Sequence, residues 1–383
     1  MPGNLRDRCA SVVFVTECAM HVSELDTPAL VVDLDILETN LREMAAYCAL
    51  HGLKLRPHTK THKIPAIARR QIESGAHGIT VAKLGEAELM ARNGFDDILI
   101  AYPIVGPSKL ARLIELSKKA RIAVSTDSLI VAEGISRAAH AAGTKIGLLA
   151  EMDAGLRRCG VQSPDELVAL ARALTRLPNI DFLGLMFFPG QVRVSPPEQA
   201  PLLKGIDDRL REAQERLLRS GIEVKGVSGG STPTAYQSHH MKTVTEIRPG
   251  TYVFNDMNTA TIGAADVAHC ALTVHVTVVS TAVKGRAVID GGSKTFSGDL
   301  LRGGAGRGFG YLLEDPAVVL ESMSEEHGHL NIETTSRSFK IGDRLRFVPN
   351  HVCTTVNMHN EVWGARTDEV VEHWIVEGRG LVK

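Results

Sequence analysis

The segment RPHTKTHK, residues 56–63, concentrates two lysines, two histidines and one arginine within eight residues. It follows the run GLKL and precedes the helix-like segment IPAIARRQIESG. A charge run of this kind is most often a solvated face of the protein. A lysine can also form a Schiff base with an aldehyde when its surroundings disfavour the ammonium form. The segment is therefore either a basic loop in solvent or the carrier of a reactive lysine.

Eight strand-like segments alternate with helix-like segments between residue 53 and about residue 250. In chain order they are LKLRP, GITVA, DILIA, RIAVST, KIGLLAEM, IDFLGLMF, EVKGVS and VTEIRP. Amphipathic segments such as DELVALARALTR separate them, and several of these end in Gly. Eight β/α units with nearly continuous apolar strands predict a closed parallel (β/α)₈ barrel. A doubly wound open sheet is the alternative, but no GxGxxG follows the first strand.

The hydrophobic pattern changes after about residue 255. Segments such as ALTVHVTVVSTAVKGRAVIDGGS alternate at period two and contain Gly turns. We therefore expect a barrel over residues 21–254, whose first residues can also join the other domain, and an all-β domain over residues 255–383. Residues 1–20 are expected to be an N-terminal extension, disordered or mis-started. Its apolar stretch SVVFV is interrupted by Thr16 and Glu17, so we do not interpret it as a secretory signal.

Composition excludes several classes of function. With 44% hydrophobic and 23% charged residues, the chain resembles an ordinary soluble globular protein. A net charge of −1 indicates neither a nucleic-acid-binding protein nor one with a polybasic membrane patch. No apolar run is long enough to span a bilayer. The six cysteines form no CxxC motif, which is typical of reduced thiols in a cytoplasmic protein.

The loops that follow the barrel strands carry the candidate chemistry. In such barrels, catalytic residues lie at the C-terminal ends of strands, and phosphate is commonly held after strands seven and eight. SGGSTPTA, residues 228–235, follows the seventh strand, and its N–H groups and hydroxyls can point at an anion. RPHTKTHK follows the first strand; if it stays extended, His58, Lys60 and His62 share one face, with Arg56 nearby. A lysine opposite a phosphate site fits pyridoxal phosphate, which has both an aldehyde and a phosphate.

From about residue 21 the chain resembles the fold-type III pyridoxal-phosphate enzymes, which have an alanine racemase-like barrel followed by a β domain. Within these it most resembles the D-threonine aldolase and D-serine dehydratase family. RPHTKTHK resembles the family's cofactor-lysine motif, which implies Lys60 as the Schiff-base lysine. Lys63 is the nearest competitor, but it is expected to begin the next helix and to face solvent.

The same resemblance implies the other cofactor-binding residues. DAGLRRCGV resembles the family segment whose arginine contacts the cofactor, which implies Arg158, with Arg157 as the alternative. The segments SGGSTPT and RPGTYVFND resemble the family's phosphate loops. They implicate Gly230, Ser231, Thr232, Gly250 and Tyr252; the alternative for Tyr252 is a buried residue at the domain junction.

A histidine and a cysteine in the β domain form a candidate metal site. His351 and Cys353 lie two residues apart on a strand-like run, which would place them on one face. Taken alone, a histidine and a free cysteine also suit a protein core. The resemblance implies a divalent-metal pair, because relatives carry His-x-Asp or, in the D-serine dehydratase branch, His-x-Cys. A thiolate favours zinc, with manganese or cobalt as alternatives, and His359 is expected on the same face as a spare ligand.

The resemblance implies a lyase that acts on D-3-hydroxy-α-amino acids with pyridoxal phosphate and a metal. The His-x-Cys pair favours dehydration to a keto acid and ammonia over retro-aldol cleavage to glycine and an aldehyde. Relatives often have Tyr and His after the sixth strand, whereas this chain has Phe188 and Gln191, which cannot act as bases. A metal-free racemase and a cofactor-binding homologue without turnover are further alternatives. By analogy with the fold, we expect a homodimer.

Overall fold

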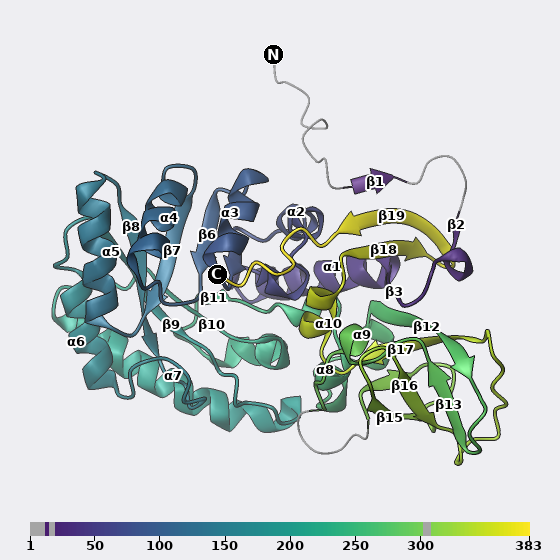
Figure 1. Cartoon of the computed structure of the whole chain (residues 1–383). Helices are drawn as coiled ribbons and strands as arrows, with labels where there is room; N and C mark the ends of the chain where they lie inside the picture. The colour runs from purple at the N-terminus through teal and green to yellow at the C-terminus, as the bar shows by residue number, and fades with distance from the viewer. Residues whose placement is uncertain (1–11, 15–19, 302–307) are drawn as a thin grey trace. The chain divides into compact units, whose positions relative to one another are not determined.

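The computed structural model describes residues 12–14, 20–301 and 308–383 (Figure 1). It divides into two compact units. The parallel unit comprises residues 43–60, 68–250 and 380–383. The antiparallel unit comprises the described residues among 1–42, 61–67 and 251–379. The described residues before 43 thus group with the β-rich unit.

Eight parallel strands form the sheet of the parallel unit, in the order β4-β11-β10-β9-β8-β7-β6-β5. Each of the eight predicted segments contributes one strand: β4 (Lys54–Leu55), β5 (Ile79–Val81), β6 (Asp97–Ile100), β7 (Arg121–Thr126), β8 (Ile146–Met152), β9 (Ile180–Phe187), β10 (Gly226–Gly229) and β11 (Glu246–Ile247). The two edges also meet, because Thr80 N donates to Pro57 O at 2.8 Å and His77 N donates to Leu55 O at 3.1 Å. The sheet therefore curls back on itself, as the sequence predicts.

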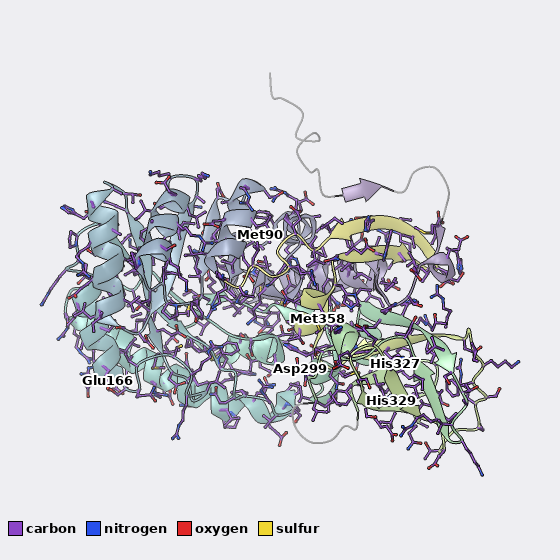
Figure 2. All side chains as sticks on the ribbon, in the orientation of Figure 1. Met90, Glu166, Asp299, His327, His329 and Met358 are labelled. Atoms are coloured by element: carbon purple, nitrogen blue, oxygen red, sulfur yellow. The ribbon has the colours of Figure 1, made fainter. Side chains whose placement is uncertain are left out.

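Helices alternate with these strands along the chain (Figure 1). They are α2 (Pro65–Glu73), α3 (Leu84–Arg92), α4 (Pro107–Ser117), α5 (Leu129–Ala141), α6 (Pro164–Leu174) and α7 (Pro196–Arg219). Helix α6 begins with a capping box, in which Glu166 N donates to Ser163 Oγ and Ser163 N donates to the Glu166 carboxylate. Figure 2 labels Glu166 on this helix and Met90 on α3, whose side chain is buried. Helix α6 thus has a polar start, and α3 and α6 each bury an apolar face, as their amphipathic patterns predict.

The antiparallel unit contains an eleven-stranded sheet among the described residues, with the path β1-β19-β18-β3-β12-β13-β16-β15-β14-β17 and β2 beside β19. Its strands are β1 (Val12–Phe14), β2 (Met20–His21), β3 (Ala29–Asp33), β12 (Leu272–Ser280), β13 (Arg286–Ile289), β14 (Gly310–Leu312), β15 (Val319–Met323), β16 (Gly328–Asn331), β17 (Arg344–Pro349), β18 (Glu361–Arg366) and β19 (Glu369–Ile375). Strand β3, the predicted ALVVDL segment, pairs with β12 and β18 and leads into α1 (Leu34–Leu50). Most of the predicted N-terminal extension lies outside the described residues, and its β1 segment pairs with β19.

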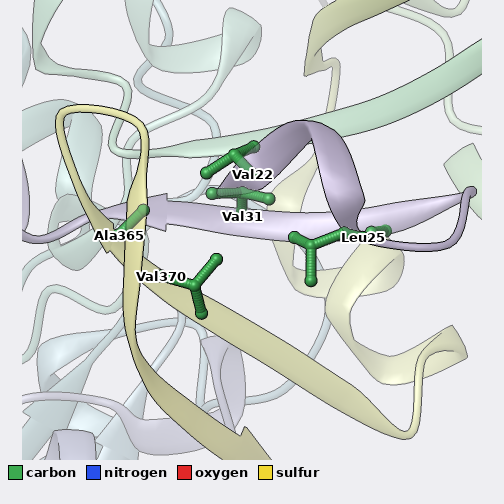
Figure 3. Close-up of a cluster of buried hydrophobic side chains, with 6 residues drawn as sticks. Val22, Leu25, Val31, Ala365 and Val370 are labelled. Atoms are coloured by element: carbon green, nitrogen blue, oxygen red, sulfur yellow. The ribbon is translucent and has the colours of Figure 1, made fainter. Parts of the chain in front are cut away.

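Alternating burial holds the antiparallel sheet together. On β12, Leu272, Val274, Val276 and Val278 are fully buried, whereas the residues between them are not. This is the period-two pattern that the sequence shows. On β3, Val31 packs in a cluster with Val22, Leu25, Ala365 and Val370 (Figure 3). Three short helices interrupt the sheet segments: α8 (Met257–Thr261), α9 (Ser293–Phe296) and α10 (Val352–Met358).

No helix in the described part of the chain combines the length and the apolar character needed to cross a membrane.

Candidate active site

Lys60 lies in a 3₁₀ turn, Thr59–Thr61, shortly after β4. The expectation that His58, Lys60 and His62 share one face is therefore wrong, because a tight turn replaces the period-two alternation of a strand. Lys60 belongs to the parallel unit, whereas Thr61 and the residues up to 67 belong to the antiparallel unit. The local sequence correctly predicted that Lys60 follows the first strand, but it did not predict the turn that sets the directions of its neighbours.

His58 is a neutral imidazole among positive charges. It is 8% exposed, and its Nδ1 atom has no hydrogen-bond partner. Burial lowers the pKa of His58 well below its usual range, and the charges of Lys60, Arg248 and Arg158 lower the pKa further. Among these cations lies Glu151, whose own pKa is raised by burial despite its attraction to Arg248. A neutral donor or acceptor surrounded by cations suits an anionic ligand such as a phosphorylated cofactor.

The two predicted phosphate loops contact each other in the parallel unit. Gly250 N donates to Thr232 Oγ1 at 3.2 Å, which joins the loop after β11 to the loop after β10. Gly230 has a φ of 88°, in the region that favours glycine. At Gly229 an added Cβ would lie 2.0 Å from the Phe187 ring, so only glycine fits there. The structure thus brings together four predicted residues, Gly230, Ser231, Thr232 and Gly250; Tyr252 is buried in the antiparallel unit.

The two neighbouring arginines have different environments. The Arg158 guanidinium lies over the Phe188 ring, with its central carbon 4.7 Å from the ring centre, and its charge acts on His58. Arg157 has a φ of 58°, and its backbone N–H donates to Asp153 Oδ1 at 3.0 Å. The charge of Arg158 therefore acts on the same buried histidine as the charge of Lys60. Gln191 Nε2 donates to Ala154 O at 2.5 Å, so its amide is already engaged.

The Arg56 guanidinium pairs with two carboxylates of the parallel unit. Its Nε lies 2.8 Å from Glu246 Oε2, and its Nη1 lies 2.7 Å from Asp97 Oδ1. Burial on its own raises the pKa of Glu246, but hydrogen bonds from His77 and Ser228 and the charge of Arg56 lower it to about 2. Two carboxylates therefore compensate the charge of Arg56. Because Glu246 and Asp97 begin their strands, this network lies at the N-terminal ends of β11 and β6.

His351 and Cys353 do not lie on a strand, so the expectation that strand alternation aligns them is wrong. Strand β17 ends at Pro349, His351 is the N-cap residue of α10, and Cys353 lies in the first turn of that helix. The two side chains nevertheless interact. Burial on its own lowers the pKa of His351, but the Cys353 thiolate and the Asp256 carboxylate outweigh burial and raise the pKa to about 10. The helix start thus brings together an imidazole ring and a cysteine sulfur.

Three further residues, which the sequence did not single out, hold this pair. Asp256 Oδ2 accepts a hydrogen bond from His351 Nδ1 at 3.1 Å. Thr61 Oγ1 lies 3.3 Å from Cys353 Sγ, and Thr251 Oγ1 lies 3.7 Å from the same sulfur. Thr251 and Asp256 lie within the predicted phosphate-loop motif RPGTYVFND, but no local pattern connects Asp256 with a residue 95 positions away.

The donor set of the pair fits a divalent ion. The imidazole can offer its other nitrogen, Nε2, and a thiolate is a strong zinc ligand. Among residues 12–14, 20–301 and 308–383, no group of three or more His, Cys, Asp or Glu side chains is arranged to hold a metal. Two protein ligands would leave positions for water or substrate, as in catalytic rather than structural sites.

Two of the alternative site residues are engaged elsewhere in the antiparallel unit. Lys63 does not begin α2 and does not face solvent: it is 7% exposed, and its Nζ donates to Asn357 Oδ1 at 2.8 Å. Helix α2 begins only at Pro65. His359, predicted as a spare ligand, lies at the end of α10, and its Nε2 is 3.1 Å from Thr295 O. The expectation that His359 shares a strand face with His351 and Cys353 is therefore wrong, because these residues border or belong to a helix.

Comparisons with known proteins agree with this architecture. The family "Alanine racemase, N-terminal domain" matches residues 32–258, and the family "Putative serine dehydratase domain" matches residues 271–364. A D-threonine aldolase from Arthrobacter sp. is 34% identical over 94% of each chain. The D-threo-3-hydroxyaspartate dehydratase of Delftia sp. (strain HT23) is 33% identical, over 91% of this chain and 97% of the relative.

Solved structures agree as well. The D-threonine aldolase from Filomicrobium marinum superposes with a TM-score of 0.88 at 34% identity, covering 96% of this chain and 100% of that one. A D-threo-3-hydroxyaspartate dehydratase, solved as a cysteine-to-alanine variant in a metal-free form, superposes with a TM-score of 0.84 at 31% identity, covering 93% and 98%. These matches confirm the resemblance seen in the sequence and the alanine racemase-like fold. The chain therefore belongs to the alanine racemase-like enzymes that depend on pyridoxal phosphate and, within them, to the lyase family of D-threonine aldolases and D-serine dehydratases.

Proposed function

We propose that the chain is a lyase for D-3-hydroxy-α-amino acids, dependent on pyridoxal phosphate and a divalent metal, and that its main reaction is loss of the β-hydroxyl group. The names of the relatives include both aldolases and dehydratases of such substrates. The observation that carries the proposal is the His351–Cys353 pair, with the imidazole held by a buried carboxylate. A β-hydroxyl is a poor leaving group near neutral pH, so its loss needs a Lewis acid or a proton donor.

The cofactor would be held by residues of the parallel unit. The contacting loops with Gly230, Ser231, Thr232 and Gly250 would bind its phosphate through backbone N–H groups and hydroxyls. Arg158 adds positive charge beside them. Bound pyridoxal phosphate would supply an electron sink for the charge that develops at the substrate Cα. We assign Lys60 as the residue that carries the cofactor and then removes the Cα proton with its Nζ.

His351 and Cys353 would hold the metal, and zinc is our first choice because a thiolate favours a soft ion; manganese or cobalt are alternatives. A bound ion would supply Lewis acidity toward the β-hydroxyl oxygen. Thr61, whose Oγ1 lies 3.3 Å from the Cys353 sulfur, follows Lys60 directly in the chain.

The nearest competing reaction is retro-aldol cleavage, which the 34% identity to a D-threonine aldolase favours. Aldol cleavage needs a base that removes the proton of the β-hydroxyl. An amide such as that of Gln191 cannot take this proton, and it already donates to Ala154 O. The loss of the hydroxyl needs no such base, so we place elimination ahead of cleavage.

The test uses purified protein loaded with cofactor and metal, and D-serine, D-threonine and D-threo-3-hydroxyaspartate as substrates. We expect ammonia and a keto acid in equal amounts from at least one of them. Release of glycine and an aldehyde without ammonia would replace elimination by aldol cleavage. Interconversion of D- and L-isomers without either product would replace the lyase by a racemase. If none of these products forms, the lyase proposal is wrong and the chain is better described as a cofactor-binding homologue without turnover.

A further inference from the structure

Asp256 is a buried carboxylate between two short helices of the antiparallel unit. Its side chain is fully buried, and it is the N-cap residue of α8. One carboxylate oxygen, Oδ1, accepts a hydrogen bond from Thr259 N at 3.0 Å. The other, Oδ2, accepts from Val352 N and from His351 Nδ1, each at 3.1 Å. The three hydrogen bonds of 3.0–3.1 Å compensate the burial of this charge, and two of them come from the start of α10.

These contacts decide which imidazole nitrogen faces outward. An ionised carboxylate can only accept hydrogen bonds, so the proton on the His351 ring that faces it must be on Nδ1. A ring that binds a metal must give up its other proton, so the metal would bind Nε2, the nitrogen that does not face Asp256. The same Oδ2 also holds the backbone of Val352, the residue between His351 and Cys353. One oxygen atom therefore fixes both the ring of the histidine and the chain that leads to the cysteine.

The surroundings of Asp256 are themselves tied to the residue before His351. Asn258, in the first turn of α8, donates to Asn350 O from its backbone N at 3.2 Å and from its Nδ2 at 2.6 Å. Hydrogen bonds from Asp256 and from Asn258 thus both connect the start of α8 to the segment around His351. A side chain that capped α8 alone would need only the contact with Thr259 N.

We infer that Asp256 is a positioning residue for the divalent ion: it holds His351 by Nδ1, so that Nε2 is the nitrogen that binds the metal, and it makes the imidazole a stronger ligand. This inference rests on the metal site in the proposed function. Carboxylates that accept the second N–H of a metal-binding histidine typically contribute about 10- to 100-fold to metal affinity. Asp256 acts through His351, so removal of its charge acts on metal binding and leaves the cofactor in place.

The test compares the full-length, cofactor-loaded protein with its Asp256→Asn variant, using zinc in competition with a chelator of known affinity. We expect the variant to bind zinc about 10- to 100-fold more weakly while it keeps its visible cofactor band. The matched control is Asp207→Asn. Asp207 is 3% exposed and accepts from Thr243 N and Oγ1, in the parallel unit. This control should lose stability without losing zinc affinity.

A double-mutant cycle separates positioning from general support of the fold. If Asp256 acts through His351, Asp256→Asn should weaken zinc binding in the parent protein but not in the His351→Ala background. An equal loss of zinc affinity in both backgrounds, or an unchanged zinc affinity in the parent, would contradict the inference and leave Asp256 with a role as a helix cap alone. A parent protein that binds no divalent ion would instead overturn the metal site of the proposed function.

A measurement on the unmodified protein covers the case in which Asp256→Asn does not fold. In the zinc-loaded protein with ¹⁵N-labelled histidine, nuclear magnetic resonance should show His351 with a proton on Nδ1 and the metal on Nε2. A metal on Nδ1 would contradict the inference, because that nitrogen could not then donate to Asp256.

Discussion

The Thr61 hydroxyl oxygen lies 3.3 Å from the Cys353 sulfur, and Thr61 directly follows Lys60 in the chain. A hydroxyl that donates to a thiolate stabilises its negative charge. Thr251 makes a longer contact, at 3.7 Å, with the same sulfur. The residue after the proposed cofactor lysine is therefore part of the environment of the proposed metal ligand.

The first prediction concerns which lysine carries the cofactor. Borohydride reduction of the yellow protein should attach the cofactor covalently to Lys60, as read by mass spectrometry of peptides. Lys63→Ala should keep this label and lose about 1.5–3 kcal/mol of stability, because it leaves the partly buried Asn357 Oδ1 without its charged hydrogen-bond donor. Recovery of the label on Lys63, or no label, would contradict the assignment.

The second prediction concerns Arg158. Arg158→Ala should weaken cofactor retention about tenfold or more, because a charged group near the phosphate loops is lost. Arg157→Asn is the matched control, since Asn tolerates the left-handed backbone at this position and keeps the N–H that binds Asp153. Cofactor affinity can be followed by absorbance during dialysis. Equal losses in both variants would indicate a structural role for the segment.

The third prediction concerns Cys353. Chelation, or Cys353→Ala, should lower lyase activity about a hundredfold or more, because Lewis-acid catalysis is worth several kcal/mol. The cofactor band should stay, since the metal pair is not expected to hold the cofactor. Cys353→Asp should shift the metal preference from zinc toward manganese. Full lyase activity in metal-free protein would contradict the role of the metal and favour a metal-independent reaction.

The fourth prediction concerns acid stability. The pKa of Glu246 is lowered from 4.5 to about 2, so its ionised form stabilises the fold above about pH 4.5, and this contribution disappears as the pH falls through about 2. Glu246→Gln should therefore be less stable near neutral pH, by on the order of 3 kcal/mol, with a difference that shrinks toward pH 2. Denaturant titrations at several pH values measure this. Glu115→Gln, at an exposed ion pair, should change stability little at any pH.

The fifth prediction concerns assembly. We propose a homodimer, by analogy with alanine racemase-like barrels. Light scattering at micromolar concentration should give twice the chain mass of 41.3 kDa. An active monomer under the same conditions would refute the proposal.

The sequence by itself determined the elements and the reactive residue types. The eight strand segments of the parallel sheet and the alternation on β12 follow from hydrophobic periods that operate over a few residues. The motifs around Lys60, Arg158 and the Gly loops are equally local. They could be recognised because a phosphate loop or a cofactor lysine requires particular residue types at short, fixed spacing.

Only the tertiary structure decided which distant residues meet. Asp256 and His351 are 95 positions apart, and Arg56 and Glu246 are 190 positions apart, so no local pattern connects either pair. The same holds for Lys63. The local pattern predicts that it faces solvent, but it is buried and donates a hydrogen bond to a residue 294 positions away. A turn at Thr59–Thr61 and a helix start at His351 also replaced the expected strand alternation. Periodicity reports which face of an element is apolar, whereas hydrogen bonds between elements depend on how the chain packs in three dimensions.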